Sequence, residues 1–185
     1  MTFDTDGPHV VAVARDRAHR FSKPLAEEIV LVEGWGVEGD AHGGPTVQHL
    51  SRLRRDPAAA NLRQVHLIHS ELFDLAEHRG HAVAPGQLGE NITTAGIDLL
   101  GLPRGARVHL GADAVVEITG LRNPCTQING LSEGLMKELV YVDDAGQTVR
   151  LAGVMSIVVR GGAVRPGDAI RVTLPEGAPE RLQAV

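Results

Sequence analysis

The residues whose chemistry stands out lie in one short stretch, Leu-Arg-Asn-Pro-Cys-Thr-Gln at positions 121–127. Cys125 is the only cysteine of the chain, so it carries a free thiol and cannot form an internal disulfide. Arg122 lies three positions upstream and favours the thiolate, which is the form that attacks electrophiles and binds soft metals. Free cysteine is also among the most buried residue types, so a small core residue is the competing interpretation.

Two further segments carry polar residues that need an explanation. Asp40 and His42 lie in a glycine-rich loop, which could bind a phosphate through backbone N–H groups or orient a ligand. The alternative is a tight turn in which Asp40 bonds to its own backbone. Glu90 and Asn91 are hard to bury without partners, so they either contact a ligand or fix a loop.

Several familiar sites are missing from the sequence. There is no Gly-x-Ser-x-Gly nucleophile motif, no phosphate-binding Walker loop and no Rossmann glycine fingerprint. The nine histidines and the single cysteine show no zinc-site spacing. We therefore expect most histidines to lie on the surface or in satisfied core positions.

Composition limits the partners. The net charge of −5 and an aromatic content of 3% argue against binding to nucleic acid. No apolar run approaches the roughly 18–20 residues of a membrane span, and the N-terminus lacks signal-peptide features. A lone free thiol fits a reducing compartment, so we expect a cytoplasmic protein.

The elements that must position these residues are short. Alternating and apolar runs predict strands at 9–14, 28–33, 64–69, 154–159 and 169–174, and a hairpin over 106–119. Serines favour helix starts at Ser70 and Ser132, for helices over 70–79 and 133–140. Many short strands joined by Pro-Gly turns indicate a mainly β fold, a barrel with a few short helices.

The chain length is enough for one domain with its own core. We expect a single domain over 1–185, with its core at about 10–174 and a loosely ordered tail at 175–185. Residues 51–63 are polar and rich in arginine, which predicts an exposed excursion.

Taken together in order, several segments resemble the MOSC domain, the family named after the C-terminal domain of molybdenum-cofactor sulfurases. The segments that carry the resemblance are FSKP (21–24), GVEGDAHGG (36–44), QVHLIHSE (64–71), PGQLGENITTAGIDLLGL (85–102), GARVHLGADAVVEITGLRNPC (105–125) and GGAVRPGDAIRV (161–172). The resemblance implies a barrel-like fold related to the β-barrel domain of pyruvate kinase. It also implies a site for the molybdenum cofactor, a phosphorylated pterin whose dithiolene sulfurs hold the metal.

The resemblance also suggests residue roles. Cys125 matches the family's functional cysteine, which is a molybdenum ligand in the reductases and is thought to carry a persulfide in the sulfurases. Arg122 and Asn123 flank it as in relatives and could hold pterin or phosphate oxygens. Lys23 lies near the family's N-terminal Lys-Ser anion-binding segment, although here the order is Ser22-Lys23.

Four other residues match motif positions to which the resemblance gives no individual role. They are Asp40, His42, Glu90 and Asn91, and they are taken as cofactor-binding candidates.

The resemblance favours a reductase of N-hydroxylated small molecules. The alternative is a sulfur-carrier module with a persulfide on Cys125, and a third possibility is a degenerate barrel that only binds a partner. This chain has no room for the pyridoxal-phosphate desulfurase that full-length sulfurases contain, so no pyridoxal phosphate is expected here. The expected partners are a small-molecule substrate, an external electron donor or a cysteine desulfurase, and a second copy of the chain as a candidate homodimer.

Overall fold

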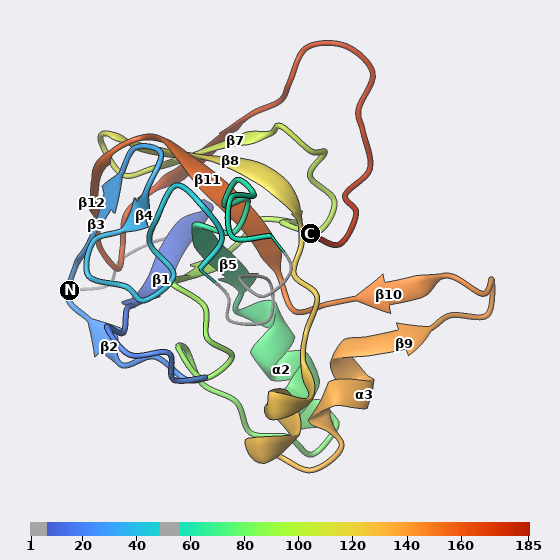
Figure 1. The fold of residues 1–185 in the computed structure, drawn as a ribbon. Coiled ribbons are helices and arrows are strands. Elements are labelled where there is room, and N and C mark those ends of the chain that lie inside the picture. The colour runs from blue at the N-terminus through green and yellow to red at the C-terminus, as the bar shows by residue number, and fades with distance from the viewer. Residues whose placement is uncertain (1–6, 49–55) are drawn as a thin grey trace.

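The computed structural model describes residues 7–48 and 56–185 of the chain. Its main feature is an eight-stranded sheet, which forms the central body of the molecule in Figure 1. The strands in their order across this sheet are β13 (Ile170–Thr173), β7 (Arg107–Leu110), β8 (Ala114–Leu121), β11 (Val154–Arg160), β5 (Val65–His69), β6 (Ile92–Ala95), β1 (His9–Ala14) and β2 (Leu25–Ala26).

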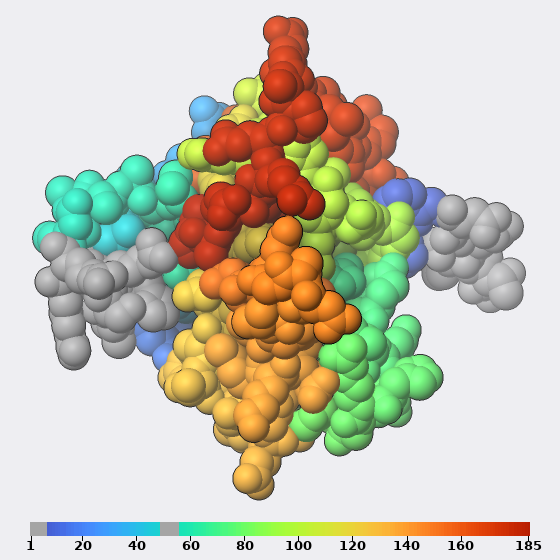
Figure 2. Space-filling view, turned by 90° about the vertical axis from the view of Figure 1, so that its right-hand side faces the viewer, coloured from blue at the N-terminus to red at the C-terminus, as the bar shows by residue number. Residues whose placement is uncertain are grey.

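Two smaller sheets complete the described strands. One has the order β12 (Gly162–Val164), β3 (Ile29–Val32) and β4 (Gly36–Val37), and the other pairs β9 (Val140–Val142) with β10 (Thr148–Arg150). The second pair projects from the body of the molecule in Figure 1 and faces the viewer in Figure 2. Neither β9 nor β10 was expected from the sequence.

The prediction of a mainly β fold is confirmed, but the sheets do not close into a continuous barrel. The strands β13 and β2 form the two edges of the main sheet. A single bridge between His9 and Ala169 brings the start of β1 to the start of β13. The Val10 N–H donates to the Asp168 oxygen at 2.9 Å, and the Gly167 N–H donates to the Val10 oxygen at 2.8 Å. The sheet therefore curls toward closure through a few backbone bonds instead of a full strand ladder.

The apolar residues of these strands meet in two core clusters. One contains the inward side chains of the main sheet, such as Val10, Leu67, Val116 and Val154. This burial follows from the near-continuous apolar runs, because strands covered on both faces need apolar residues at successive positions. The second cluster lies beneath the helices and includes Ile128.

Three short helices cover the lower end of the sheet in Figure 1: α2 (Glu71–His78), the 3-10 helix η1 (Thr126–Gly130) and α3 (Leu135–Leu139). The helix α2 begins directly after Ser70, as predicted, although the Ser70 side chain makes no cap hydrogen bond. The predicted start of α3 is wrong: Gly134, in the left-handed conformation, occupies the N-cap position. The Ser132 hydroxyl bonds to His81 Nδ1 at 2.7 Å instead.

Two segments differ from the sequence expectation. Residues 51–55 of the predicted excursion lie outside the described residues, but Asn61 is buried and donates to the His42 and Gly44 carbonyls at 3.0 and 2.9 Å. The end of the chain, expected to be loosely ordered, runs back along β8. There the Leu121 N–H donates to the Gln183 oxygen at 2.8 Å, and Leu182 packs against the main core.

Candidate functional site

Cys125 lies at the end of the turn that leaves β8. Its backbone is extended, with φ of −119° and ψ of 165°, and it occupies the N-cap position of η1. The side chain is half-buried, and Sγ donates to Gln127 Oε1 at 3.3 Å. The thiol is therefore neither a sealed core group nor a fully solvated one, which leaves it accessible to a ligand from one side.

Arg122 begins the same turn and is almost fully buried, with 7% of its surface exposed. Its N–H donates to the Gly153 oxygen at 3.0 Å, and its guanidinium carbon lies 5.8 Å from the centre of the Phe21 ring. The Nη1 atom is buried and has no hydrogen-bond partner among the described residues. Burial lowers the pKa of Arg122, while the charges of Cys125 and Glu90 act in the opposite direction. A buried cationic donor without an acceptor is costly, because the lost hydration is not replaced.

Glu90 is the second buried ionisable group with an unpartnered atom. It is fully buried, and its Oε1 accepts from the Gly86 N–H and from the Thr93 hydroxyl at 3.3 Å. Its Oε2 has no partner in the described structure. Burial raises the pKa of Glu90, although hydrogen bonds and the Arg122 charge oppose the rise.

Asp40 is the centre of a third buried group. Its Oδ2 lies 2.7 Å from Lys23 Nζ and accepts from the Asp16 N–H at 3.2 Å and from Asn91 Nδ2 at 3.0 Å. Its Oδ1 accepts from the His42 N–H at 2.9 Å and lies 3.1 Å from His42 Nδ1. Burial acts to raise the pKa of Asp40, but the His42 hydrogen bonds and Lys23 outweigh it and hold the pKa well below the usual range. Asp40 is therefore a carboxylate that joins the glycine-rich loop to the loop after β1.

Asn91 extends this network into the sheet. Its Oδ1 accepts from the His66 N–H at 3.2 Å, and its Nδ2 also donates to the Ala14 oxygen at 3.2 Å. It thus joins β1 and β5 at their ends. Burial lowers the pKa of Lys23 against the attraction of Asp40, and the Lys23 side chain is only 3% exposed.

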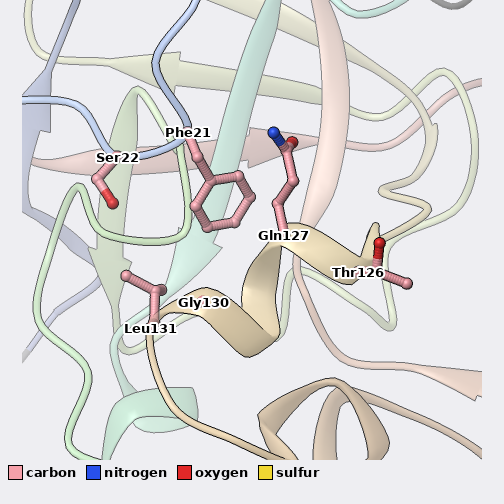
Figure 3. A pocket seen from close by; sticks show the side chains of 6 residues that line it. All are labelled: Phe21, Ser22, Thr126, Gln127, Gly130 and Leu131. Atoms are coloured by element: carbon pink, nitrogen blue, oxygen red, sulfur yellow. The ribbon is translucent and has the colours of Figure 1, made fainter.

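A pocket of about 520 Å³ lies beside the turn that carries Cys125. The residues that line it are Phe21, Ser22, Thr126, Gln127, Gly130 and Leu131. Figure 3 shows the Phe21 ring reaching from the loop before β2 toward η1, with Gln127 on one side and Leu131 on the other. These residues carry no formal charge, so the pocket offers an aromatic face, an aliphatic wall and neutral hydrogen-bonding groups.

The structure thus groups the predicted site residues unequally. Lys23, Asp40, His42 and Asn91 form one buried network, and Arg122 and Cys125 share one turn. Asn123 lies on the exposed side of that turn, where its Oδ1 accepts from Arg150 Nε at 3.3 Å.

Sequence reasoning missed two residues that connect these parts. Phe21 touches both the pocket and the Arg122 cation, and Gln127 touches both the pocket and the thiol. Both residues had a sequence feature that could have indicated them: Phe21 is one of only three phenylalanines, and Gln127 lies two positions after Cys125. No three His, Cys, Asp or Glu side chains gather as a metal site among the residues with defined positions.

Comparisons with known proteins identify the family of this chain. The model of the MOSC domain matches residues 38–171. YuaD of Bacillus subtilis, named as a candidate metal–sulfur cluster biosynthesis protein, is 28% identical over 145 residues, which are 74% of this chain and 76% of YuaD.

Solved structures show the same fold. The crystal structure of YuaD from Bacillus subtilis has a TM-score of 0.72 at 22% identity and covers 91% of this chain and 97% of that one. YiiM from Geobacillus stearothermophilus has a TM-score of 0.61 at 17% identity and covers 90% of this chain and 75% of that one. Across the described residues, no helix is both long and apolar enough to cross a membrane. Because the family model matches well over half of its residues, the chain belongs to the MOSC domain family.

Proposed function

We propose that this chain binds the molybdenum cofactor at Cys125 and reduces N-hydroxylated small molecules in the adjacent pocket. The observation that carries the proposal is that an unsatisfied buried cation and an accessible thiol share one turn. Arg122 offers a buried donor without an acceptor, and Cys125, three residues later, offers a half-buried thiol.

The donor set fits the cofactor. A phosphorylated pterin with dithiolene sulfurs is an anion, so it needs a cationic donor and a soft metal ligand. Arginine provides a rigid fork for anionic oxygens, and a thiolate is a suitable soft ligand. Cys125 would bind the metal, the free Nη1 of Arg122 would donate to an anionic oxygen, and Asn123 would offer its amide from the outer side of the turn.

The other candidate residues would not contact the ligand but would fix the segments that surround the site. Lys23 and Asp40 neutralise one another and are buried, so they would reach a ligand only if their ion pair opened. We therefore propose that they fix the loop carrying Phe21 and Ser22 against the sheet. His42, Asn91 and Glu90 would act in the same way, through the hydrogen bonds that join the surrounding segments.

The proposed reaction removes oxygen from nitrogen. The N–O bond breaks, two electrons and two protons enter, and the products are the reduced nitrogen compound and water. The bound cofactor would supply the two-electron transfer, and an external donor protein would supply the electrons. The chain's own contribution is the neutral pocket, where the Phe21 ring and the Gln127 amide would orient an uncharged substrate.

The test is the molybdenum and pterin content of protein made in a cofactor-competent host. We expect near-stoichiometric metal and pterin in the wild type, and loss of the metal and of reductase activity in Cys125→Ser. In Arg122→Gln the cofactor affinity should fall at least tenfold, the effect expected for a lost charged hydrogen bond of about 1.5–3 kcal/mol. Arg171→Gln, which changes an exposed arginine on β13 that does not line the pocket, serves as the control and should behave like the wild type. Wild-type protein without metal or pterin, or an unchanged Cys125→Ser, would overturn the proposal.

One observation favours a second function. The relative YuaD is named for metal–sulfur cluster biosynthesis, which agrees with a sulfur carrier. In that case the Cys125 thiolate would accept a sulfur atom from the persulfide of a cysteine desulfurase, which would recover its own thiolate. Mass spectrometry after incubation with a desulfurase and cysteine would then show one added sulfur atom on the wild type and none on Cys125→Ser.

A further inference from the structure

The side chains of Arg15 and Arg17 converge on Gly39, and none of these three residues lines the pocket. A side-chain carbon placed on Gly39 would lie 3.2 Å from Arg15 Nη1 and 3.7 Å from Arg17 Nε. Gly39 has a φ of +72°, a conformation that suits glycine and leaves the backbone bare. Two guanidinium groups therefore lie over the same uncovered stretch of backbone.

Hydrogen bonds fix the backbone of the two loops that carry Arg15, Arg17 and Gly39. Arg15 Nη1 donates to the Glu38 oxygen at 3.0 Å, which fixes its guanidinium beside the glycine-rich loop. The Ala41 N–H donates to the Asp16 oxygen at 2.8 Å, and the Asp16 N–H donates to Asp40 Oδ2 at 3.2 Å. These bonds fasten the loop after β1 to the glycine-rich loop, so the convergence follows from the fold.

The carboxylates of Asp16 and Asp40 are engaged by other cations. The Asp16 carboxylate binds Arg20, with Nε at 2.6 Å and Nη2 at 3.0 Å, and the Asp40 carboxylate binds Lys23. Within residues 7–48 and 56–185, no ion pair includes Arg15 or Arg17. In a chain with a net charge of −5, these two cations are thus left uncompensated in the described structure.

We propose that Arg15, Arg17 and the backbone at Gly39 form a binding site for a phosphoryl dianion. Each guanidinium offers several N–H donors in a planar fork, which matches phosphate oxygens. A glycine without a side chain lets such a group approach the main chain closely. The site shares no residue with the Cys125 turn or the pocket, so it goes beyond the proposed reductase. Its ligand is free phosphate or the phosphomonoester end of a larger molecule.

The site can be tested by titrating cofactor-free protein with inorganic phosphate in a calorimeter, at fixed ionic strength. We expect saturable binding at one site, weakened about tenfold in Arg15→Gln and in Arg17→Gln, because each change removes a charged hydrogen bond. Arg171→Gln is the matched control, since Arg171 is an exposed arginine on β13 that forms no ion pair with any residue of the described structure. Urea denaturation should show that all three variants remain folded.

The result that would overturn the proposal is equal phosphate binding by the wild type and both site variants, or no saturable binding at all. A second titration, on cofactor-loaded protein, separates the two sources of phosphate. Loss of free phosphate binding after loading would mean that the cofactor's own phosphate fills the site, whereas unchanged binding would mean that the site takes a separate phosphate. The first titration needs no cofactor, so the phosphate site can fail while the proposed reductase stands, and the reverse.

Discussion

Asp40 is the residue that joins the two loops beside the pocket, and its charge is fully buried. We expect Asp40→Asn to destabilise the protein by about 3–5 kcal/mol, because Lys23 is then left as an uncompensated buried cation. Urea denaturation at neutral pH measures the change. Glu138→Gln is the control: it breaks the half-exposed pair with Arg79 and should cost less than about 1 kcal/mol. Equal effects of the two variants would show that the Asp40 network does not hold the fold.

At the scale of single residues, the sequence indicated which side chains were candidates for the site but not which residues they contact. Asp40 stood out because it lies in a glycine-rich loop, and Asn91 because polar side chains are hard to bury without partners. Their contact, 3.0 Å between Nδ2 and Oδ2, joins positions 51 residues apart, and no local pattern encodes such a contact. The same holds for Phe21 over Arg122, since a ring and a cation far apart in sequence meet only through the folded sheet.

At the scale of elements, the connection between β10 and β11 positions Arg122. Gly153 has a φ of +82°, and its carbonyl accepts the Arg122 N–H at 3.0 Å. A Cβ at this position would overlap with the Leu67 carbonyl oxygen of β5. The close approach of two backbones, rather than the turn alone, therefore requires glycine here.

Alanine substitution should have unequal effects at two glycines with similar φ angles, Gly153 and Gly167. Gly167 has a φ of +90° and open space around it, so Gly167→Ala should cost only the left-handed strain of about 1–2 kcal/mol. Gly153→Ala should cost about 1–3 kcal/mol more, because the added methyl also forces the β5 backbone aside. Chemical denaturation of both variants gives the difference, and a crystal structure of Gly153→Ala should show Arg122 displaced. Equal costs would contradict the role of the Leu67 contact.

Most regular elements were predictable, because apolar runs bounded by glycine and proline mark buried strands. The strand predicted at 9–14 and the helix after Ser70 match the observed β1 and α2. The start of α3 was not predictable from the serine signal, since Gly134 adopts a left-handed conformation that ends the preceding turn. The strands β9 and β10 were missed because their side chains are largely exposed and show no buried pattern.

For the whole molecule, the sequence motifs indicated the fold family, and the structure corrected the shape. Closure of a barrel depends on how far a sheet twists and where its edge strands meet, and no single segment encodes this. Here β13 and β1 meet only near His9 and Ala169, so the sheet stays open along the rest of its two edge strands, β13 and β2.

The free energy of unfolding should decrease both as the pH falls below about 3.8 and as it rises above about 4.5, because two buried carboxyl groups have shifted pKa values in opposite directions. The pKa of Asp40 is lowered, so its contribution is present above its ordinary value of 3.8 and is lost as the pH falls further. The pKa of Glu90 is raised from 4.5, so the folded state holds a proton that the unfolded state releases. Its contribution is therefore complete below pH 4.5 and is lost as the pH rises toward the folded pKa.

Glu90→Gln isolates the second effect, because the amide keeps the shape of the side chain and does not titrate. We expect the free energy of unfolding of Glu90→Gln, relative to that of the wild type, to increase as the pH rises from 4.5 toward 8. Urea denaturation of both proteins at several pH values in this range measures it. Asp98→Asn is the matched control, since Asp98 is exposed and caps a turn through the Gly101 N–H, and it should show no such trend. A constant difference between Glu90→Gln and the wild type would mean that Arg122 and the Gly86 N–H keep Glu90 ionised in the fold, and that the buried carboxylate is already compensated.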